Sequence, residues 1–219
     1  ELYGTRMGAY IDFDKSSPQI QVQIATSFIS IEQARMNLEH EVPEWDFKQL
    51  CNNTKKAWND KLSKFHIKGN NKDDAPIFYT ALYHCYLFPR EFSEYGKYYS
   101  AFDDKIHDGF SYNDYSLWDT FRAFHPLMTL IEPDLTSDWI TALLQMYKEG
   151  GWLPMWPNPS YTNFMIGTHA DAVIADAYMK GIRNYDIGLA YEALRKNAMV
   201  PPDCDTQRRY GDRDYWTSS

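Results

Sequence analysis

A change in hydrophobic period near Pro43 is the feature that most constrains how this chain folds. Before it, residues 7–13 and 20–25 alternate apolar with polar side chains, as β-strands do, on either side of a Lys15–Pro18 turn. After it, apolar residues recur at helical spacing. A hairpin alone is marginally stable in water, so we expect these strands to belong to a sheet whose other strands lie outside the chain or against the helices.

The part that follows Pro43 is predicted to be helical. Pro89 stops the second of its helices, and a long irregular loop is expected over residues 90–113. Asp74, Ser137 and Thr168 are candidate caps at helix starts. The predicted helices span residues 43–66, 74–88, 114–130, 137–150, 168–181 and 186–197.

Successive helices of this length pack as antiparallel neighbours, so alternate connections fall at the same end of the layer. The loop 89–113, the segment 150–167 and the helix termini beside them are therefore expected at one end, and the short connections at the other. Long loops at one end of helix hairpins suit an (α/α) barrel enzyme, because the loops can line a pocket on a rigid scaffold. A complete barrel of six hairpins needs about twelve helices. Five are predicted here beside the linker helix 43–66, so we expect less than half of a barrel.

Composition excludes several classes of protein. The 30 acidic and 22 basic residues give a formal net charge of −8 without a run of like charge, which argues against a nucleic-acid partner or an anionic membrane surface. No apolar stretch approaches the roughly 18 residues that span a bilayer, and no signal-peptide pattern opens the sequence. Cys51, Cys85 and Cys204 lie far apart and are predicted to be buried thiols.

The segment Ser116–Arg122 places a carboxylate, an indole and a guanidinium at the start of a predicted helix. Asp119 can accept two sugar hydroxyls, Trp118 can cover an apolar sugar face, and Arg122 can hold Asp119 ionised. The same spacing also suits an ordinary helix start, where Asp favours the helix dipole and Arg pairs with it three residues later. Both interpretations remain open at this point.

Two further segments combine rigid backbone with polar side chains. Gly150–Asn158 holds two glycines, two prolines and two tryptophans, and Trp152 is its first aromatic face. His169 and Asp171 fall in the first turn of the helix after Thr168, where His169 is either a wall of a pocket or an ordinary hydrogen-bonded histidine. No zinc site is expected there, because no second histidine lies at ligand spacing.

The loop 89–113 is rich in charged residues among tyrosines. A calcium loop is conceivable, but the spacing does not match the EF-hand pattern, which favours a solvated loop. The residues concerned are Glu91, Glu94, Asp103, Asp104, Lys105, His107 and Asp108.

Read in order, several motifs resemble glycoside hydrolase family 92, the calcium-dependent exo-α-mannosidases. The match spans nearly the whole chain, and the order and spacing of four motifs make it specific. The segments that carry it are Ile24–Ser30, Ala34–Glu39, Phe78–His84, Ser116–Arg122, Gly150–Trp156 and Gly167–Asp171, continuing to Lys180–Gly181.

This resemblance implies a mainly α fold. Residues 1–42 would be the C-terminal strands of an N-terminal β-sandwich domain, 43–73 a linker helix, and 74–219 the first part of an (α/α)6 barrel catalytic domain. It also implies that calcium assists an inverting hydrolysis of terminal mannose from α-mannosides or N-glycans. The catalytic acid and base, and most calcium contacts, are expected outside this chain, which is therefore expected to be incomplete.

By the same resemblance, the partner is a mannose-containing oligosaccharide or glycoprotein glycan, and the location is extracytoplasmic, either secreted or periplasmic. Asp119, with Trp118 and Arg122, would hold the mannose in the −1 subsite. Trp152, His169 and Asp171 would line or support the pocket. Two alternatives remain: a carbohydrate-binding or scaffold domain without catalysis, and a barrel enzyme that acts on another sugar.

Overall fold

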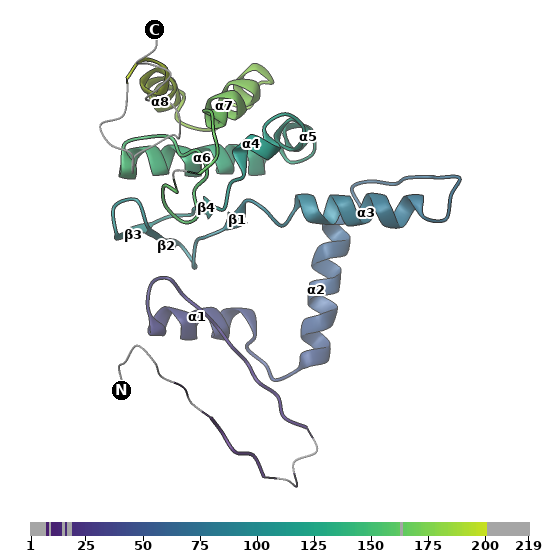
Figure 1. Ribbon diagram of the computed structural model, residues 1–219. Coiled ribbons are helices and arrows are strands. Elements are labelled where there is room, and N and C mark those ends of the chain that lie inside the picture. Colours follow the sequence, from purple (N-terminus) through teal and green to yellow (C-terminus); the bar gives the residue numbers. More distant parts are fainter. Residues whose placement is uncertain (1–7, 9, 15, 17–18, 163, 201–219) are drawn as a thin grey trace.

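The structure is a computed structural model that describes residues 8, 10–14, 16, 19–162 and 164–200. It is mainly helical, and Figure 1 shows a layer of helices at one side, joined through two further helices to an extended N-terminal part. The elements in chain order are α1 (Ile31–Glu41), α2 (Phe47–Leu62), α3 (Asp74–Cys85), β1 (Arg90–Glu91), β2 (Lys97–Ser100), β3 (Lys105–Asp108), β4 (Tyr112–Asn113), α4 (Leu117–Thr120), α5 (Phe124–Ile131), α6 (Pro133–Gly150), α7 (His169–Met179) and α8 (Ile187–Met199).

The N-terminal part differs from the predicted hairpin. Its described residues before Ser30 form no strand, and residues 31–41, predicted to be part of a β region, form α1. The side chain of Ser30 accepts a hydrogen bond from the backbone N–H of Gln33, which caps this helix. A hairpin without neighbouring strands buries too little apolar surface to be stable, so the alternation alone was a poor guide here.

The helix after Pro43 is confirmed as α2, but its apolar stripe is not buried. No residue of α2 is buried, Phe47 is largely exposed, and Cys51 is exposed rather than buried as predicted. Cys85 is partly buried, and Cys204 lies outside the described residues. The far end of α2 is tied to the helical layer through Lys64, whose ammonium lies 2.5 Å from a carboxylate oxygen of Glu132.

The segment predicted as an irregular loop contains two small antiparallel sheets instead. β1 pairs with β4, and β2 pairs with β3 in a hairpin whose register places Tyr98 opposite His107. Tyr98 and Ser100 are buried, while Lys97 is exposed. This alternation is the period-2 signal of a strand, and it was obscured by the density of charged residues.

The helix predicted over residues 114–130 is broken into α4 and α5. Pro126 lies in the first turn of α5, where its missing N–H costs nothing, so a new helix starts there. The next helix, α6, begins at Pro133 for the same reason, four residues before the predicted Ser137 cap. Its predicted end is confirmed: Gly151 closes it with a left-handed φ of 88°.

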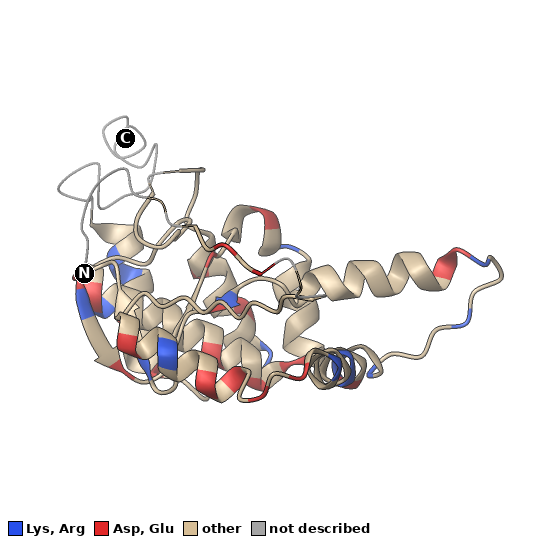
Figure 2. Ribbon diagram, turned by 90° about the horizontal axis from the view of Figure 1, so that it is seen from below, with Lys and Arg blue, Asp and Glu red and all other residues tan. Residues whose placement is uncertain are grey.

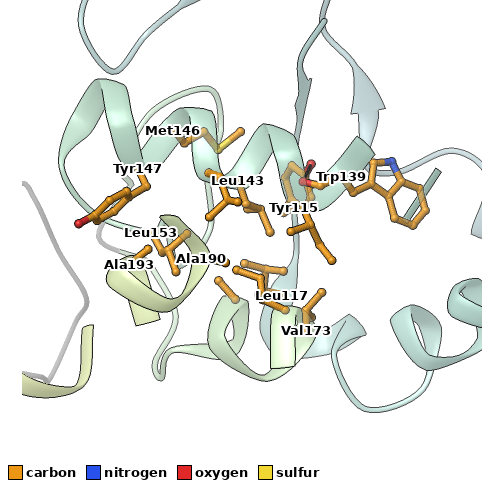
Figure 3. Packing of buried hydrophobic residues seen from close by; sticks show 14 of the residues in the cluster. Tyr115, Leu117, Trp139, Leu143, Met146, Tyr147, Leu153, Val173, Ala190 and Ala193 are labelled. Atoms are coloured by element: carbon orange, nitrogen blue, oxygen red, sulfur yellow. Dashed lines mark hydrogen bonds between the residues drawn. The ribbon is translucent and has the colours of Figure 1, made fainter. Parts of the chain in front are cut away.

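The core forms around α6. This helix contacts α5, α7, α8 and β4, and Figure 3 shows its apolar side chains between the surrounding elements. Leu143 is fully buried in the middle of the cluster, and the hydroxyl of Tyr115 donates to the carbonyl of Trp139 at 2.9 Å. Small residues, Ala170 in α7 and Ala193 in α8, allow these two helices to lie close to the cluster.

The last two helices agree with the sequence prediction within two residues. Thr168 precedes α7, although its side chain makes no capping bond, and the Asp186 side chain caps α8 by accepting from the N–H of Leu189. The short connection between them brings the carbonyl of Asn184 to the hydroxyl of Ser137, at 2.7 Å. The α7–α8 pair is therefore fixed to the N-terminal half of α6.

Charged residues of both signs are interspersed along the ribbon in Figure 2, which agrees with the absence of charge runs in the sequence. Among the described residues, no helix is long and apolar enough to cross a membrane.

Replacement of Leu143 tests the central role of α6. We expect Leu143→Ala to lower the free energy of unfolding by about 2–5 kcal/mol, because it leaves a cavity in a fully buried position. Leu130→Ala, at a position that is 77% exposed, should change it by less than about 0.5 kcal/mol. Urea unfolding of both variants measures this difference, and equal effects would show that α6 is not the core helix.

His125 predicts an acid-sensitive core. Burial lowers its pKa to about 4 from 6.5, and its Nδ1 has no hydrogen-bond partner among the described residues. Between pH 6.5 and 4 the unfolded chain binds a proton at His125 that the folded chain does not, so the free energy of unfolding falls as pH falls. The loss is roughly 3 kcal/mol by pH 4, at about 1.4 kcal/mol per pKa unit. His125→Leu should flatten this dependence in urea titrations, and His66→Leu, at an exposed histidine, should not.

Candidate functional site

The long loops meet at one end of α6, as the helix topology predicted. The side-chain amide of Asn113 donates to the carbonyl of Pro159 at 2.8 Å, and the rings of Phe102 and Tyr161 pack edge to face at 4.8 Å. The segments before α4 and after α6 are thus in direct contact. The site residues predicted from the sequence fall into two groups around this end.

The first group joins α4 to the start of α7. The Arg122 guanidinium lies over the ring of Trp118 at 5.0 Å and over that of Phe121 at 4.8 Å. Phe121 in turn packs against His169, with ring centroids 4.3 Å apart. An exposed indole and a guanidinium are therefore held at the surface by a partly buried contact between the end of α4 and the start of α7.

The surroundings of His169 favour the neutral form of its imidazole. Burial lowers its pKa, and the nearby positive charge of Arg122 lowers it further. Its Nδ1 is buried without a hydrogen-bond partner among the residues that the structure describes. Gly167, at a φ of 83°, leaves room for this ring, since a Cβ there would overlap it. A neutral imidazole carries one N–H donor and one acceptor nitrogen, so it can donate to or accept from a hydroxyl.

Asp119 is exposed, and it is held by a hydrogen bond from the Ser116 hydroxyl rather than by Arg122. Within the described chain Arg122 makes no ion pair with Asp119, contrary to the role that the sequence suggested for it. The arginine stacks on aromatic rings instead, which is a geometry that a planar guanidinium favours. The carboxylate therefore keeps accepting capacity that faces solvent.

The second group lies where the loop after α6 meets α8. Trp152 is buried, and the phenol of Tyr161 both accepts from its backbone N–H and donates to its carbonyl, at 3.0 and 2.6 Å. The Lys196 ammonium lies 4.5 Å from the indole ring centre and 2.8 Å from the carbonyl of Gly151. Trp152 therefore supports the loop from within and does not present an open face to a ligand.

Asp171 is tied to α8 in the same region. The Asn197 amide donates to its Oδ1 at 2.7 Å, and Asn197 itself is buried. Asp171 and His169 lie two residues apart in the first turn of α7, so they face different sides of the helix. Asp171 belongs to the support of the site, whereas His169 adjoins the exposed group at α4.

Sequence reasoning missed four residues that hold the site together. Phe121 lies inside a motif that was singled out, and its spacing from Trp118 places it on the same turn. Lys196, Asn197 and Tyr161 carry no local signal, because their partners lie at least nine residues away in the chain.

The residues considered for calcium do not form a calcium cage. Within the described part of the chain, one group of three ligand-type side chains converges: Asp103, His107 and Glu149, with one ligand atom from each within 4.8 Å. Calcium takes six to eight oxygen ligands, and here one of the three ligand atoms is an imidazole nitrogen. These residues therefore do not fit calcium.

Three comparisons with known proteins bear on this site. The model of the glycosyl hydrolase family 92 catalytic domain matches residues 33–219. A curated relative from Arthroderma benhamiae, named as an uncharacterized secreted glycosidase, is 31% identical in an alignment of 220 positions that covers 96% of this chain and 24% of the relative.

Solved structures give the same picture. The family GH92 inverting mannosidase BT2199 from Bacteroides thetaiotaomicron matches with a TM-score of 0.82 and 34% identity, over 88% of this chain and 27% of that one. The α-mannosidase BT3965 of the same organism matches at 0.76 and 31% identity, over 81% and 24%. BT3965 is also known in complex with mannoimidazole. The chain thus spans about a quarter of the length of these relatives.

The charge of Arg122 should be detectable at His169. In Arg122→Gln we expect the pKa of His169 to rise toward its ordinary value, because the nearby positive charge disfavours the imidazolium. Arg183→Gln, which removes another ring-stacked arginine, from Tyr178, is the matched control and should leave it unchanged. NMR titration of the His169 ring protons measures both, and an unchanged pKa in Arg122→Gln would refute the contact.

Proposed function

The chain belongs to glycosyl hydrolase family 92, and on this premise we propose that it supplies part of the mannose-binding site of an α-mannosidase. The observation that carries the proposal is the arrangement on α4, where the consecutive residues Trp118 and Asp119 expose an indole and a carboxylate. A flat apolar face next to a hydrogen-bond acceptor is what recognition of a sugar ring requires.

The proposed substrate is a terminal mannose of an α-mannoside or N-glycan. Support comes from the names of the similar solved structures, which are mannosidases, one of them described as inverting and one bound to mannoimidazole. In this proposal Asp119 accepts two hydroxyls of the mannose in the −1 subsite, and Trp118 covers its apolar face. Arg122 sets the orientation of the indole by stacking on it. His169 forms a polar wall at the start of α7.

We propose an inverting reaction in which the acid and the base are supplied from outside these 219 residues. In such a reaction one carboxylic acid protonates the leaving oxygen, and a carboxylate about 6.5–9.5 Å away activates water on the opposite face of the sugar. This chain contributes binding and orientation. Calcium, when bound elsewhere in the protein, would polarise the sugar hydroxyls. Trp152 and Asp171 keep the loop after α6 and the start of α7 in place.

The architectural part of the proposal follows the family. Residues 74–219 would begin an (α/α)6 barrel, 43–73 would form the linker helix, and 1–42 would be the remnant of a β-sandwich domain. The hairpin packing of α5 to α8 around one core supports the barrel start. The curated relative is named as secreted, which supports an extracytoplasmic location for this protein.

The alternative of a carbohydrate-binding or scaffold domain without catalysis is not favoured. The family model that matches 33–219 describes a catalytic domain, and the solved relatives are enzymes. A barrel enzyme for another sugar is disfavoured by the same names.

Asp119→Ala tests the binding role. We expect the free energy of mannoimidazole binding to become less favourable by on the order of 1.5–3 kcal/mol relative to the unchanged chain, because a hydrogen bond to a charged acceptor is removed. The control is Asp134→Ala, which removes an exposed aspartate from the first turn of α6. This variant should bind mannoimidazole as the unchanged chain does. Isothermal calorimetry measures both, and equal affinity of the two variants would exclude Asp119 from the site.

Mannose release tests the reaction. A family-length protein that contains this chain should release mannose from α-mannobioses with calcium present and not with a chelator, and NMR should detect the β-anomer first. The 219-residue chain alone should release none. Activity of the chain alone would place the acid and base within it, and an α-anomeric first product would contradict inversion.

A further inference from the structure

The group formed by Asp103, His107 and Glu149 lies apart from the exposed site on α4. Asp103 is in the turn between β2 and β3, His107 is on β3, and Glu149 is in the last turn of α6. The His107 Nε2 lies 3.1 Å from both carboxylate oxygens of Asp103 and 4.0 Å from Oε1 of Glu149. One nitrogen thus stands between two carboxylates from different elements.

The charge of Glu149 is poorly compensated. Its side chain is 9% exposed, and its two oxygens accept from the hydroxyls of Tyr98 and Ser100 at 2.5 and 2.6 Å. Both donors are neutral, and the nearest cationic group within the described residues is the imidazole at 4.0 Å. A carboxylate that is largely withdrawn from water is stabilised further by a positive partner, such as a protonated base or a metal ion.

The other carboxylate does not resolve this imbalance. Asp103 is also mostly buried, with a side chain 17% exposed, and it already takes the closer position beside His107. The Lys105 ammonium lies 3.5 Å from a carboxylate oxygen of Asp103, but the lysine side chain is 70% exposed and therefore largely solvated. Two partly buried carboxylates therefore share a single imidazole, which carries at most one positive charge, and the exposed ammonium of Lys105.

The donor set and its dimensions suit a borderline divalent metal. Zinc bonds to imidazole nitrogen and carboxylate oxygen are about 2.0–2.2 Å, so tetrahedral ligands lie about 3.3 Å apart. The separations of 3.1 and 4.0 Å from the imidazole nitrogen bracket that value, and all three ligand atoms lie within 4.8 Å. Tyr98 and Ser100 hold Glu149 in place, as hydrogen bonds to metal ligands commonly do.

We propose that Asp103, His107 and Glu149 bind one zinc ion, with a fourth position left to water. The ion takes the place between the imidazole and the two carboxylates, and it offsets their charge. It ties the β2–β3 hairpin to the end of α6, one residue before Gly150 and the loop that holds Trp152. The role is structural: it fixes the start of that loop.

Calorimetry with zinc ion on the metal-free chain tests the proposal. We expect one zinc per chain, with affinity lowered about tenfold or more in His107→Gln and in Glu149→Gln. Gln at 107 can still donate to Asp103, so the fold is kept while the nitrogen ligand is lost. His66→Gln, which removes an exposed histidine on the loop after α2, should bind zinc as the unchanged chain does.

The outcomes distinguish a zinc site from a cluster of side chains that is held together by hydrogen bonds alone. Melting temperatures measured in chelator show whether each variant is folded. Tyr98→Phe removes one hydrogen bond to Glu149, and it should weaken zinc binding by about tenfold if that bond positions the ligand. Absence of saturable zinc binding, or equal affinity in the unchanged chain and the His107 and Glu149 variants, overturns the proposal. Displacement of zinc by equimolar calcium would also overturn it, since a site built on an imidazole nitrogen prefers zinc.

Discussion

Burial of α6 is the interaction on which the rest of the structure depends. Its middle turns lie in the apolar cluster with α5, α7 and α8, and the cluster includes Leu143 and Met146 at almost no exposure. Each of the surrounding helices buries its own apolar face only because α6 offers a partner surface. By contrast α2 contacts α3, where the ring centroids of Trp58 and Tyr83 lie 4.4 Å apart, but no residue of α2 is buried.

The position of α6 also determines where polar side chains gather. Its C-terminal end is followed by Gly151, whose carbonyl accepts from Lys196, and is preceded by Glu149, which accepts from the β2–β3 hairpin. Free carbonyls at a helix end attract donors, as that of Gly151 does, whereas the hydroxyls of Tyr98 and Ser100 donate to the side chain of Glu149. Elsewhere Phe121, directly after α4, packs against His169 at the start of α7.

Membership of family 92 connects this arrangement with sugar chemistry, since the matching relatives are glycosidases. Among the predicted site residues, the structure distinguishes those that reach the surface from those that support it. Trp118 and Asp119 are exposed, His169 is half-buried beside them, and Trp152 is enclosed by Tyr161 and Lys196. A motif match alone does not distinguish the residues that reach the surface from those that support them.

The sequence by itself determined the helical class, the α6 end at Gly151, the positions of α7 and α8, and the motifs of the family, because each of these depends on local periodicity, capping or residue order. Tertiary structure decided the rest. The β2–β3 hairpin, the break between α4 and α5, and the helix in place of a strand at Ile31–Glu41 depend on which neighbours are present to bury a face. Arg122 has several possible partners near it in the sequence, and only packing decides that it stacks on aromatic rings. His107 and Glu149 lie far apart in the sequence, and only packing brings them together.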